Sequence, residues 1–269
     1  MKKLLFLILV FFWFTPSNGA FEPKGYGTNY TGSGMTGIAS QDIAFDVFLN
    51  PAKLSLTQTA SFDLFYRNFY GISGLNQITL GSSFNILNVP VGFGINRFGN
   101  SLYAETETRI ALAKEIADAF SIGVSLNWYH LDIDNYGQAQ SLGFDISGFY
   151  QINRQFSSAF IVSNLNEPEI GQAQEKLPSS FSFGLSYSPI NELNLNIDLV
   201  KDNEFDFDYR FGLHYNLFQS VQLLTGFRQV VHSYSGGILM KKNHINIGYA
   251  LEYHPDLGSS NTISFGYEL

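Results

Sequence analysis

The chain contains no cysteine, and only 14% of its 269 residues are charged. Without cysteine it has no disulfide bond, no thiolate metal site and no lipid anchor on an N-terminal cysteine. A soluble domain usually carries about 25% charged residues, so the shortage of charge indicates that much of the surface does not face water. Beyond the N-terminus, no segment has the roughly 20 consecutive apolar residues that a membrane-spanning helix needs.

The N-terminus has the pattern of a secretory signal peptide. Lys2 and Lys3 precede an apolar run at residues 4–14, and a short polar stretch then ends at Gly19 and Ala20. This order predicts that residues 1–20 are cleaved after Gly19 or Ala20. A membrane anchor is the alternative, but the apolar run is too short to span. Removing the two lysines makes a formal net charge of -8 still more negative, which disfavours nucleic acid as a partner.

From residue 58 onward, apolar and polar residues alternate along the chain. Ile78, Leu80, Phe84 and Ile86 are separated by polar or small residues, and residues 120–128 repeat the pattern. A period of two gives a β-strand one apolar and one polar face. The pattern predicts about fourteen strands, most of them long enough to cross a bilayer when tilted. They lie near residues 59–69, 76–86, 89–98, 102–114, 119–131, 141–151, 154–163, 179–188, 192–201, 205–217, 220–229, 233–241, 244–253 and 261–269.

The connections between these segments alternate between tight and long. The long ones, at residues 132–140, 164–178 and 254–260, all fall on the same side by strand parity. Outer-membrane barrels have short periplasmic turns and longer external loops. We therefore expect these three connections outside the cell and both chain termini on the periplasmic side.

A soluble β-sandwich or lipocalin-like barrel would also show alternation. Here, however, the apolar faces almost lack charge, and the polar faces combine glycine, serine and asparagine with charges of both signs. In lipid every main-chain amide must be paired, which a sheet achieves by closing on itself. Residues 58–269 are therefore predicted to form an all-β fold, a closed antiparallel transmembrane β-barrel of the bacterial outer membrane. Tyrosine and tryptophan near strand ends, typical of membrane interfaces, are Trp128, Tyr187, Tyr215, Tyr249, Tyr253 and Tyr267.

Residues 21–57 precede the first predicted strand and alternate only weakly. They include Phe45, Phe48, Asn50 and Pro51 and are too apolar for a disordered tail. A barrel of about fourteen strands is wide enough to hold such a segment, so we predict an N-terminal plug. The glycine spacing at residues 32–37 matches a dinucleotide-binding motif, but the flanking strand and helix that this motif requires are missing. Turns within the plug are the preferred interpretation.

Histidine and carboxylate residues indicate neither a metal site nor catalysis. None of the five histidines has metal-binding spacing on a helix. His214 lies on a polar face, where Asp206 or Asp208 could orient it for a hydrolase, but no serine lies in a G-x-S-x-G turn. Charges on the polar faces could pair across strands, or form an acidic ring that selects cations. We expect no enzyme, no catalytic residue, no cofactor and no metal.

Several large apolar residues interrupt the polar faces. The favoured hypothesis is that they form a small core with the plug. In the alternative, part of this surface stays open and binds an alkyl or aromatic molecule, with Arg67 or Arg228 holding a carboxylate. The residues expected at such a site are Phe65, Arg67, Phe149, Ile161, Leu224 and Arg228.

Two groups of motifs resemble a known superfamily. Residues 34–37 (G-M-T-G) and Asn50-Pro51-Ala52 resemble the N-terminal hatch of FadL-like outer-membrane proteins, with departures at Thr36 and at Lys53-Leu54. Residues 175–178 (E-K-L-P) and 254–258 (H-P-D-L-G) resemble the PorV/PorQ branch of that superfamily. The resemblance covers nearly the whole mature chain and implies a barrel of about fourteen strands with a hatch.

The resemblance also suggests functions. Members of the wider superfamily take up fatty acids or aromatic hydrocarbons, whereas PorV and PorQ relatives serve type IX secretion. We therefore expect passive transport of small hydrophobic molecules across the outer membrane. The alternative is a non-conducting PorV/PorQ-like component of a type IX protein secretion system. Expected partners are outer-membrane lipid, the barrel assembly machinery and either a small hydrophobic ligand or secretion-system proteins.

Overall fold

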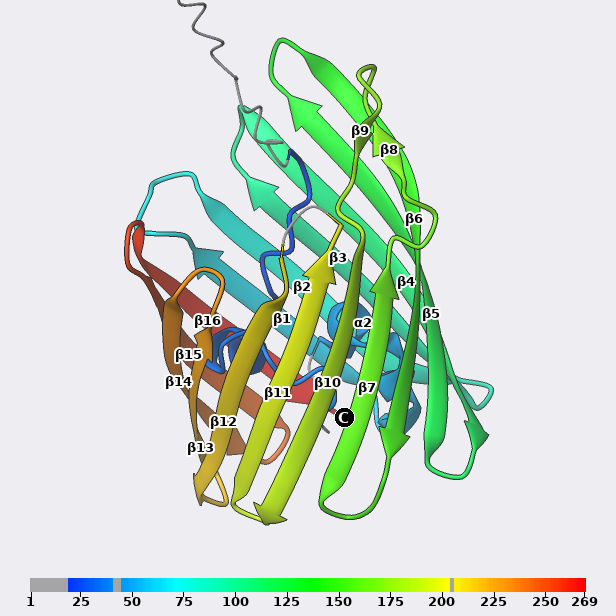
Figure 1. The fold of residues 1–269 in the computed structure, drawn as a ribbon, viewed down its shortest axis with the longest axis vertical. Coiled ribbons are helices and arrows are strands. Elements are labelled where there is room, and N and C mark those ends of the chain that lie inside the picture. Colours follow the sequence, from blue (N-terminus) through cyan, green and yellow to red (C-terminus); the bar gives the residue numbers. More distant parts are fainter. Residues whose placement is uncertain (1–18, 41–44, 204–205) are drawn as a thin grey trace, which may run out of the picture.

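The computed structural model describes residues 19–40, 45–203 and 206–269. Residues 1–18, which hold most of the predicted signal peptide, lie outside the described residues. Fourteen strands form one closed antiparallel barrel around the N-terminal part of the chain (Figure 1). The fold class predicted from the alternation is therefore confirmed. Within the described part of the chain, no helix is long and apolar enough to cross a membrane.

Each barrel strand pairs with its neighbour in the sequence, and β1 closes the barrel by pairing with β16. Two further short strands, β8 (Glu169–Ile170) and β9 (Glu175–Lys176), form a separate hairpin in the connection between β7 and β10. The barrel strands are β1 (Ser61–Asn68), β2 (Asn76–Ile86), β3 (Val89–Gly99), β4 (Tyr103–Ala117), β5 (Phe120–Ile133), β6 (Gly137–Gln151), β7 (Phe156–Ser163), β10 (Ser180–Ile190), β11 (Leu193–Asp202), β12 (Asp208–Phe218), β13 (Val221–Arg228), β14 (Ser233–Lys242), β15 (Ile245–His254) and β16 (Gly258–Glu268).

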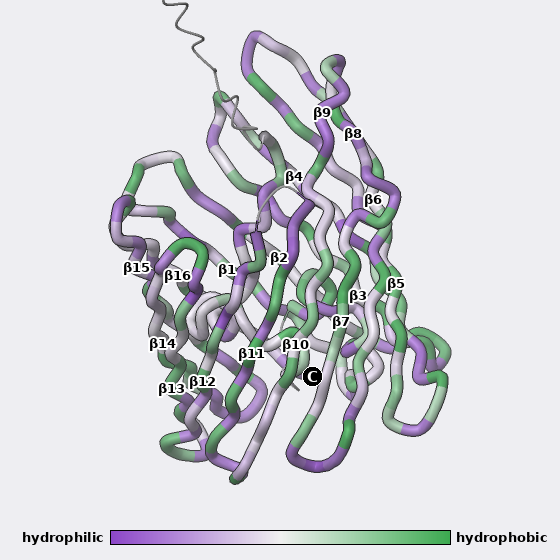
Figure 2. The backbone as a smooth tube through the Cα atoms, in the orientation of Figure 1, coloured by the Kyte–Doolittle hydropathy of each residue, from purple (hydrophilic) through white to green (hydrophobic). Residues whose placement is uncertain are grey.

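The alternation has the physical meaning expected for a barrel in lipid. In β1, Phe62 and Leu64 point outward and are each 47% exposed, whereas Asp63, Phe65 and Arg67 point inward and are buried. The same change of character from one residue to the next runs along the other strands (Figure 2). An apolar surface that surrounds the whole barrel would be unfavourable in water and suits a hydrocarbon environment.

The connections at one end of the barrel are all short, and the other end carries the long connection between β7 and β10. We call these the turn end and the loop end. The structure corrects two of the three predictions of long connections, those at residues 132–140 and 254–260. Strands β5 and β6 continue to residues 133 and 137, and β15 and β16 to residues 254 and 258, so short turns join them. Outward residues such as Asp132, Gln138 and Gln140 are polar there, so the strands continue without apolar alternation.

The inner segment, residues 19–40 and 45–57, occupies the barrel interior. It contains α1 (Thr28–Gly32), α2 (Asp46–Leu49) and the 3-10 helix η1 (Pro51–Leu56). Its first residues lie at the loop end, where the ring of Phe21 contacts Tyr129 and Lys24 pairs with Glu105. The expectation that both ends of the mature chain lie on the turn side is therefore wrong for the N-terminal part. Tyr129 lies in the part of β5 near the loop end, and Glu105 lies in the corresponding part of β4.

Candidate ligand-binding lumen

The inner segment has little secondary structure, and side chains of the wall pair with its main chain instead. Asp198 accepts hydrogen bonds from Gly37 N at 2.8 Å and Ile38 N at 3.2 Å. Arg109 donates to the carbonyl oxygen of Phe48 at 3.1 Å. These bonds hold the segment against many strands at once. The other wall residues that bind its main chain are Arg67, Gln77, Asn85, Ser147, Ser157, Arg210 and Ser235.

Glycines make close contact between the inner segment and the wall possible. Gly34 has a φ of +72°, and a Cβ there would lie 2.6 Å from the main-chain nitrogen of Phe227. Opposite it, a Cβ on Gly226 would lie 2.3 Å from the nitrogen of Gly34. At these distances neither position has space for a side chain. The motif at residues 32–37 thus serves packing between main chains.

The large apolar residues that interrupt the polar faces pack against the inner segment. Phe65 belongs to a buried cluster with Phe45, Phe48 and Leu54. Phe149 belongs to another, whose members are Ile38, Ala39, Ala52, Ala159 and Ile161. Leu224 lies against Gly32, where an added Cβ would come within 2.9 Å of its side chain. This arrangement matches the favoured hypothesis of a small core between plug and wall.

The buried charges form a paired network. Arg109 binds Glu107 at 2.7 Å and Asp145 at 2.9 Å. Within the inner segment, Lys53 is 1% exposed and its ammonium group lies 2.6 Å from Asp46. Breaking a buried pair by removing one partner costs about 3–5 kcal/mol, because it leaves an uncompensated charge. Among the described residues, the other buried pairs are Lys24–Glu105, Arg67–Glu252, Arg210–Asp208 and Arg228–Asp208.

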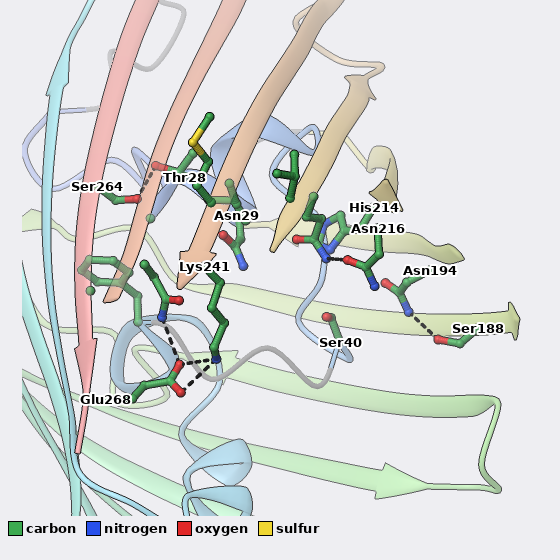
Figure 3. Close-up of a pocket in the computed structure, with 18 of the residues that line it drawn as sticks. Thr28, Asn29, Ser40, Ser188, Asn194, His214, Asn216, Lys241, Ser264 and Glu268 are labelled. Carbon is green, nitrogen blue, oxygen red and sulfur yellow. Dashed lines mark hydrogen bonds and ion pairs between the residues drawn. The ribbon is translucent and has the colours of Figure 1, made fainter. Parts of the chain in front are cut away.

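The described residues line two large cavities in the lumen. The turn-end cavity has a volume of about 410 Å³ and is lined largely by amide and hydroxyl groups. Figure 3 shows its lining, which includes His214, Asn216 and the pair Lys241–Glu268, joined at 2.9 Å. Asp206 and Asp208 line the other cavity, so the structure does not bring His214 together with either carboxylate.

The loop-end cavity has a volume of about 340 Å³ and a more apolar lining. The inner segment contributes Tyr30, Met35 and Ile38, and the wall contributes Ile161 and Val200. Above it, an apolar cluster joins Phe21 and Tyr129 to Ile170 and Leu177 of the β8–β9 region. Phe21 and Tyr129 also line the cavity, so this cluster forms part of its outer boundary.

Of the six residues expected at a ligand site, Ile161 and Arg228 line the loop-end cavity. Phe65, Arg67, Phe149 and Leu224 line neither cavity. Sequence reasoning missed the residues that the inner segment supplies, because alternation does not reveal where a segment without strands runs. The hatch-like motif at residues 34–37 was the one available signal, since Met35 and Ile38 lie in or next to it.

The arginines of the loop-end cavity already have partners. Arg228 reaches Asp208 through Nη2 at 3.0 Å, and its Nη1 lies 3.3 Å from the sulfur of Met35. Arg210 binds the same carboxylate through Nε at 2.6 Å. Among residues 19–40, 45–203 and 206–269, no three histidine or acidic side chains are grouped so that they could hold a metal ion.

Comparisons with known proteins find similarity in structure and not in sequence. No protein-family model matches the chain, and no curated protein matches it. The Ralstonia pickettii toluene transporter TbuX superposes with a TM-score of 0.69 at 13% identity, over 91% of this chain and 98% of that one. The CymD monoaromatic hydrocarbon channel gives 0.68 at 14% identity, over 93% and 99%. A Pseudomonas aeruginosa FadL homologue gives 0.65 at 10% identity, over 90% and 98%. At these identities the likeness establishes a FadL-like fold.

Proposed function

We propose that the protein is an outer-membrane barrel that admits small hydrophobic molecules, with its loop end facing the outside of the cell. The observation that carries this proposal is the loop-end cavity of about 340 Å³, whose surface is more apolar than polar, inside a barrel with an apolar exterior. Ligand pockets are usually concave and mostly apolar with a few polar groups. The proposal includes a signal peptide at residues 1–20, cleaved on export, and a plug at residues 21–57.

The similar structures support this proposal by analogy. Two of the proteins that share the fold are described as a toluene transporter and a monoaromatic hydrocarbon channel. Function does not follow from fold, so the proposal depends on the cavity of this chain. In this chain it combines aromatic and aliphatic side chains from the inner segment and the wall.

A charge placed in either cavity tests the proposal. Val200 lines the loop-end cavity and Gln222 the turn-end cavity. We expect Val200→Glu to lower the uptake of radiolabelled naphthalene, by cells that produce the protein, roughly tenfold or more. The substitution replaces an apolar contact with a carboxylate, and an apolar ligand would have to displace the water bound to that charge. Gln222→Glu adds the same charge to the polar cavity and should leave binding of naphthalene to the purified barrel unchanged. Heat-resistant migration on gels checks that both variants fold.

The alternative is a PorV/PorQ-like component of a type IX secretion system that conducts nothing. The observation that favours it is the apolar cluster of Phe21, Tyr129, Ile170 and Leu177 at the loop end, which forms part of the outer boundary of the loop-end cavity. A secretion component would present this end to protein partners and would need no ligand. If the wild-type barrel neither binds nor transports any hydrophobic compound, this alternative replaces the transport proposal.

A further inference from the structure

We infer that the loop-end cavity selects uncharged amphipathic molecules, with an apolar body and one hydroxyl or carbonyl group, and excludes carboxylates. The inference rests on the proposed function and narrows it to a ligand class. It differs from the sequence-based expectation that Arg67 or Arg228 holds a carboxylate. Three features of the cavity lead to it: the pairing of its arginines, its balance of charge and a row of serine hydroxyls.

The arginines of the cavity are all held by carboxylates of the protein. Arg210 and Arg228 share Asp208, with distances of 2.6 and 3.0 Å. Arg109 binds both Glu107 and Asp145. Arg67 pairs with Glu252 and lies outside the cavity lining. A ligand carboxylate would therefore have to displace a protein carboxylate before it could form the paired, charge-assisted bonds that arginine offers.

The balance of charge also opposes an anion. Among the described residues, five carboxylates and three guanidinium groups line the cavity. Charges near a protein surface interact with an effective dielectric constant of about 20, so like charges a few ångströms apart repel by several kcal/mol. An incoming carboxylate thus meets net repulsion, whereas a neutral molecule does not. The five carboxylates are those of Glu22, Glu107, Asp202, Asp206 and Asp208.

Hydroxyl groups are available to a neutral ligand. Ser163 on β7 and Ser180 on β10 are register partners, and Ser182 follows on β10. All three line the cavity and are half-buried. Among the described residues, no hydrogen bond joins their hydroxyls to another group. A hydroxyl both donates and accepts, so this row can bind a ligand hydroxyl or carbonyl while Ile161 and Val200 beside it contact the apolar body.

The size of the cavity sets the size of the ligand. A cavity of roughly 150 Å³ holds one benzene molecule, and the volume here is about 340 Å³. By that comparison the space fits up to roughly fourteen carbon atoms, so a ten-carbon chain has room. 1-Decanol, decanoate and decane are suitable probes, because they share one chain and differ only at the head.

The experiment measures binding of the three radiolabelled probes to the full-length processed protein in nanodiscs, by equilibrium dialysis against empty nanodiscs at pH 7.5. We expect 1-decanol to bind roughly tenfold or more tightly than decanoate, from the repulsion described above. Replacing the hydroxyls in Ser180→Ala/Ser182→Ala should weaken 1-decanol binding about two- to tenfold, the usual worth of one neutral hydrogen bond. Decane binding should not change in that variant.

A second variant reverses the selectivity. Asp208→Asn releases Arg210 and Arg228 from their shared partner, so decanoate affinity should rise roughly tenfold or more. Asp63→Asn removes the same charge from the turn-end cavity and should leave the ratio of the two affinities unchanged. If Asp208→Asn does not fold, the relative affinities of the wild type for 1-decanol and decanoate still test the inference. Salt screens buried charges only weakly, so the preference for 1-decanol over decanoate should persist when salt is added.

The outcomes separate the inference from the proposed function. Decanoate binding to the wild type as tightly as 1-decanol would overturn the inference and leave hydrophobic transport standing. Equal affinities for decane and 1-decanol, unchanged in the serine variant, would overturn the role of the hydroxyls. Failure of all three probes to bind, together with failure of naphthalene uptake, would overturn the proposed function and the inference with it.

Discussion

Phe149→Ala is expected to loosen the inner segment while leaving the barrel intact. The ring of Phe149 points into the lumen from β6 and is 2% exposed. Of the five other members of its buried cluster, Ile38, Ala39 and Ala52 belong to the inner segment. The strand ladder on either side of β6 uses main-chain groups, so truncating this side chain removes none of the barrel's own hydrogen bonds.

The size of the effect follows from the burial. Replacing a buried phenylalanine with alanine costs about 3–5 kcal/mol, including the cavity left behind. With three of the five cluster partners in the inner segment, about half of that cost, roughly 1.5–2.5 kcal/mol, weakens the hold on this segment. Because about 1.4 kcal/mol corresponds to a factor of ten, the equilibrium constant for detachment should rise roughly 10- to 60-fold.

Trypsin cleavage after Lys53 measures detachment. Lys53 is 1% exposed and paired with Asp46, so the protease reaches it only when the segment leaves the wall. When reclosing is fast, the cleavage rate follows the equilibrium population of the open form. Phe144→Ala is the matched control, because Phe144 lies on the same strand but points outward and is 50% exposed. Equal cleavage rates in the two variants would refute the packing argument.

Three further predictions concern the interior and the topology. Gly34→Val places a Cβ 2.6 Å from the main-chain nitrogen of Phe227 and should speed the same trypsin cleavage. An unchanged cleavage rate would show that the inner segment is not in close contact with the wall at this position. Arg109→Met leaves Glu107 and Asp145 without their cation and should lower the free energy of unfolding in denaturant by about 3–5 kcal/mol. Adding Glu107→Gln and Asp145→Asn to this variant should restore much of that stability. No rescue would argue against the pairing. A cysteine at Gln172 should react with a membrane-impermeant reagent on intact cells. If that cysteine does not react, the loop end faces the periplasm and the proposed orientation is wrong.

The strands could be predicted because successive residues of each strand face lipid and lumen in turn and differ in polarity accordingly. Phe62, Leu64 and Tyr66 face outward and Asp63, Phe65 and Arg67 inward, so the sequence repeats the contrast between lipid and lumen. That contrast ends where strands extend beyond the part of the barrel whose outward residues are apolar. Asp132 and Gln138 lie opposite each other in the β5–β6 pairing, yet both are polar, and the alternation there predicted a long loop.

The lumen could be predicted only in part. Inward apolar residues such as Phe149 indicated contact with the plug or with an apolar ligand, because large apolar side chains are unfavourable in a water-filled lumen. The partners of the charges could not be predicted, since Arg228 meets Asp208 only through the register of β13 with β12. The cavity was also hidden, because Tyr30 and Met35 reach it through a segment whose course no periodic pattern records.

The most direct test of the account is a crystal structure of the protein soaked with 10-bromodecan-1-ol, in which the bromine is located by its anomalous signal. A hydrophobic ligand site at the loop end predicts bromine density inside the lumen, near Tyr30, Met35 and Ile161, where apolar groups line the cavity. Bromine density confined to the outward, lipid-facing side of the barrel would contradict the claim that this cavity receives hydrophobic molecules.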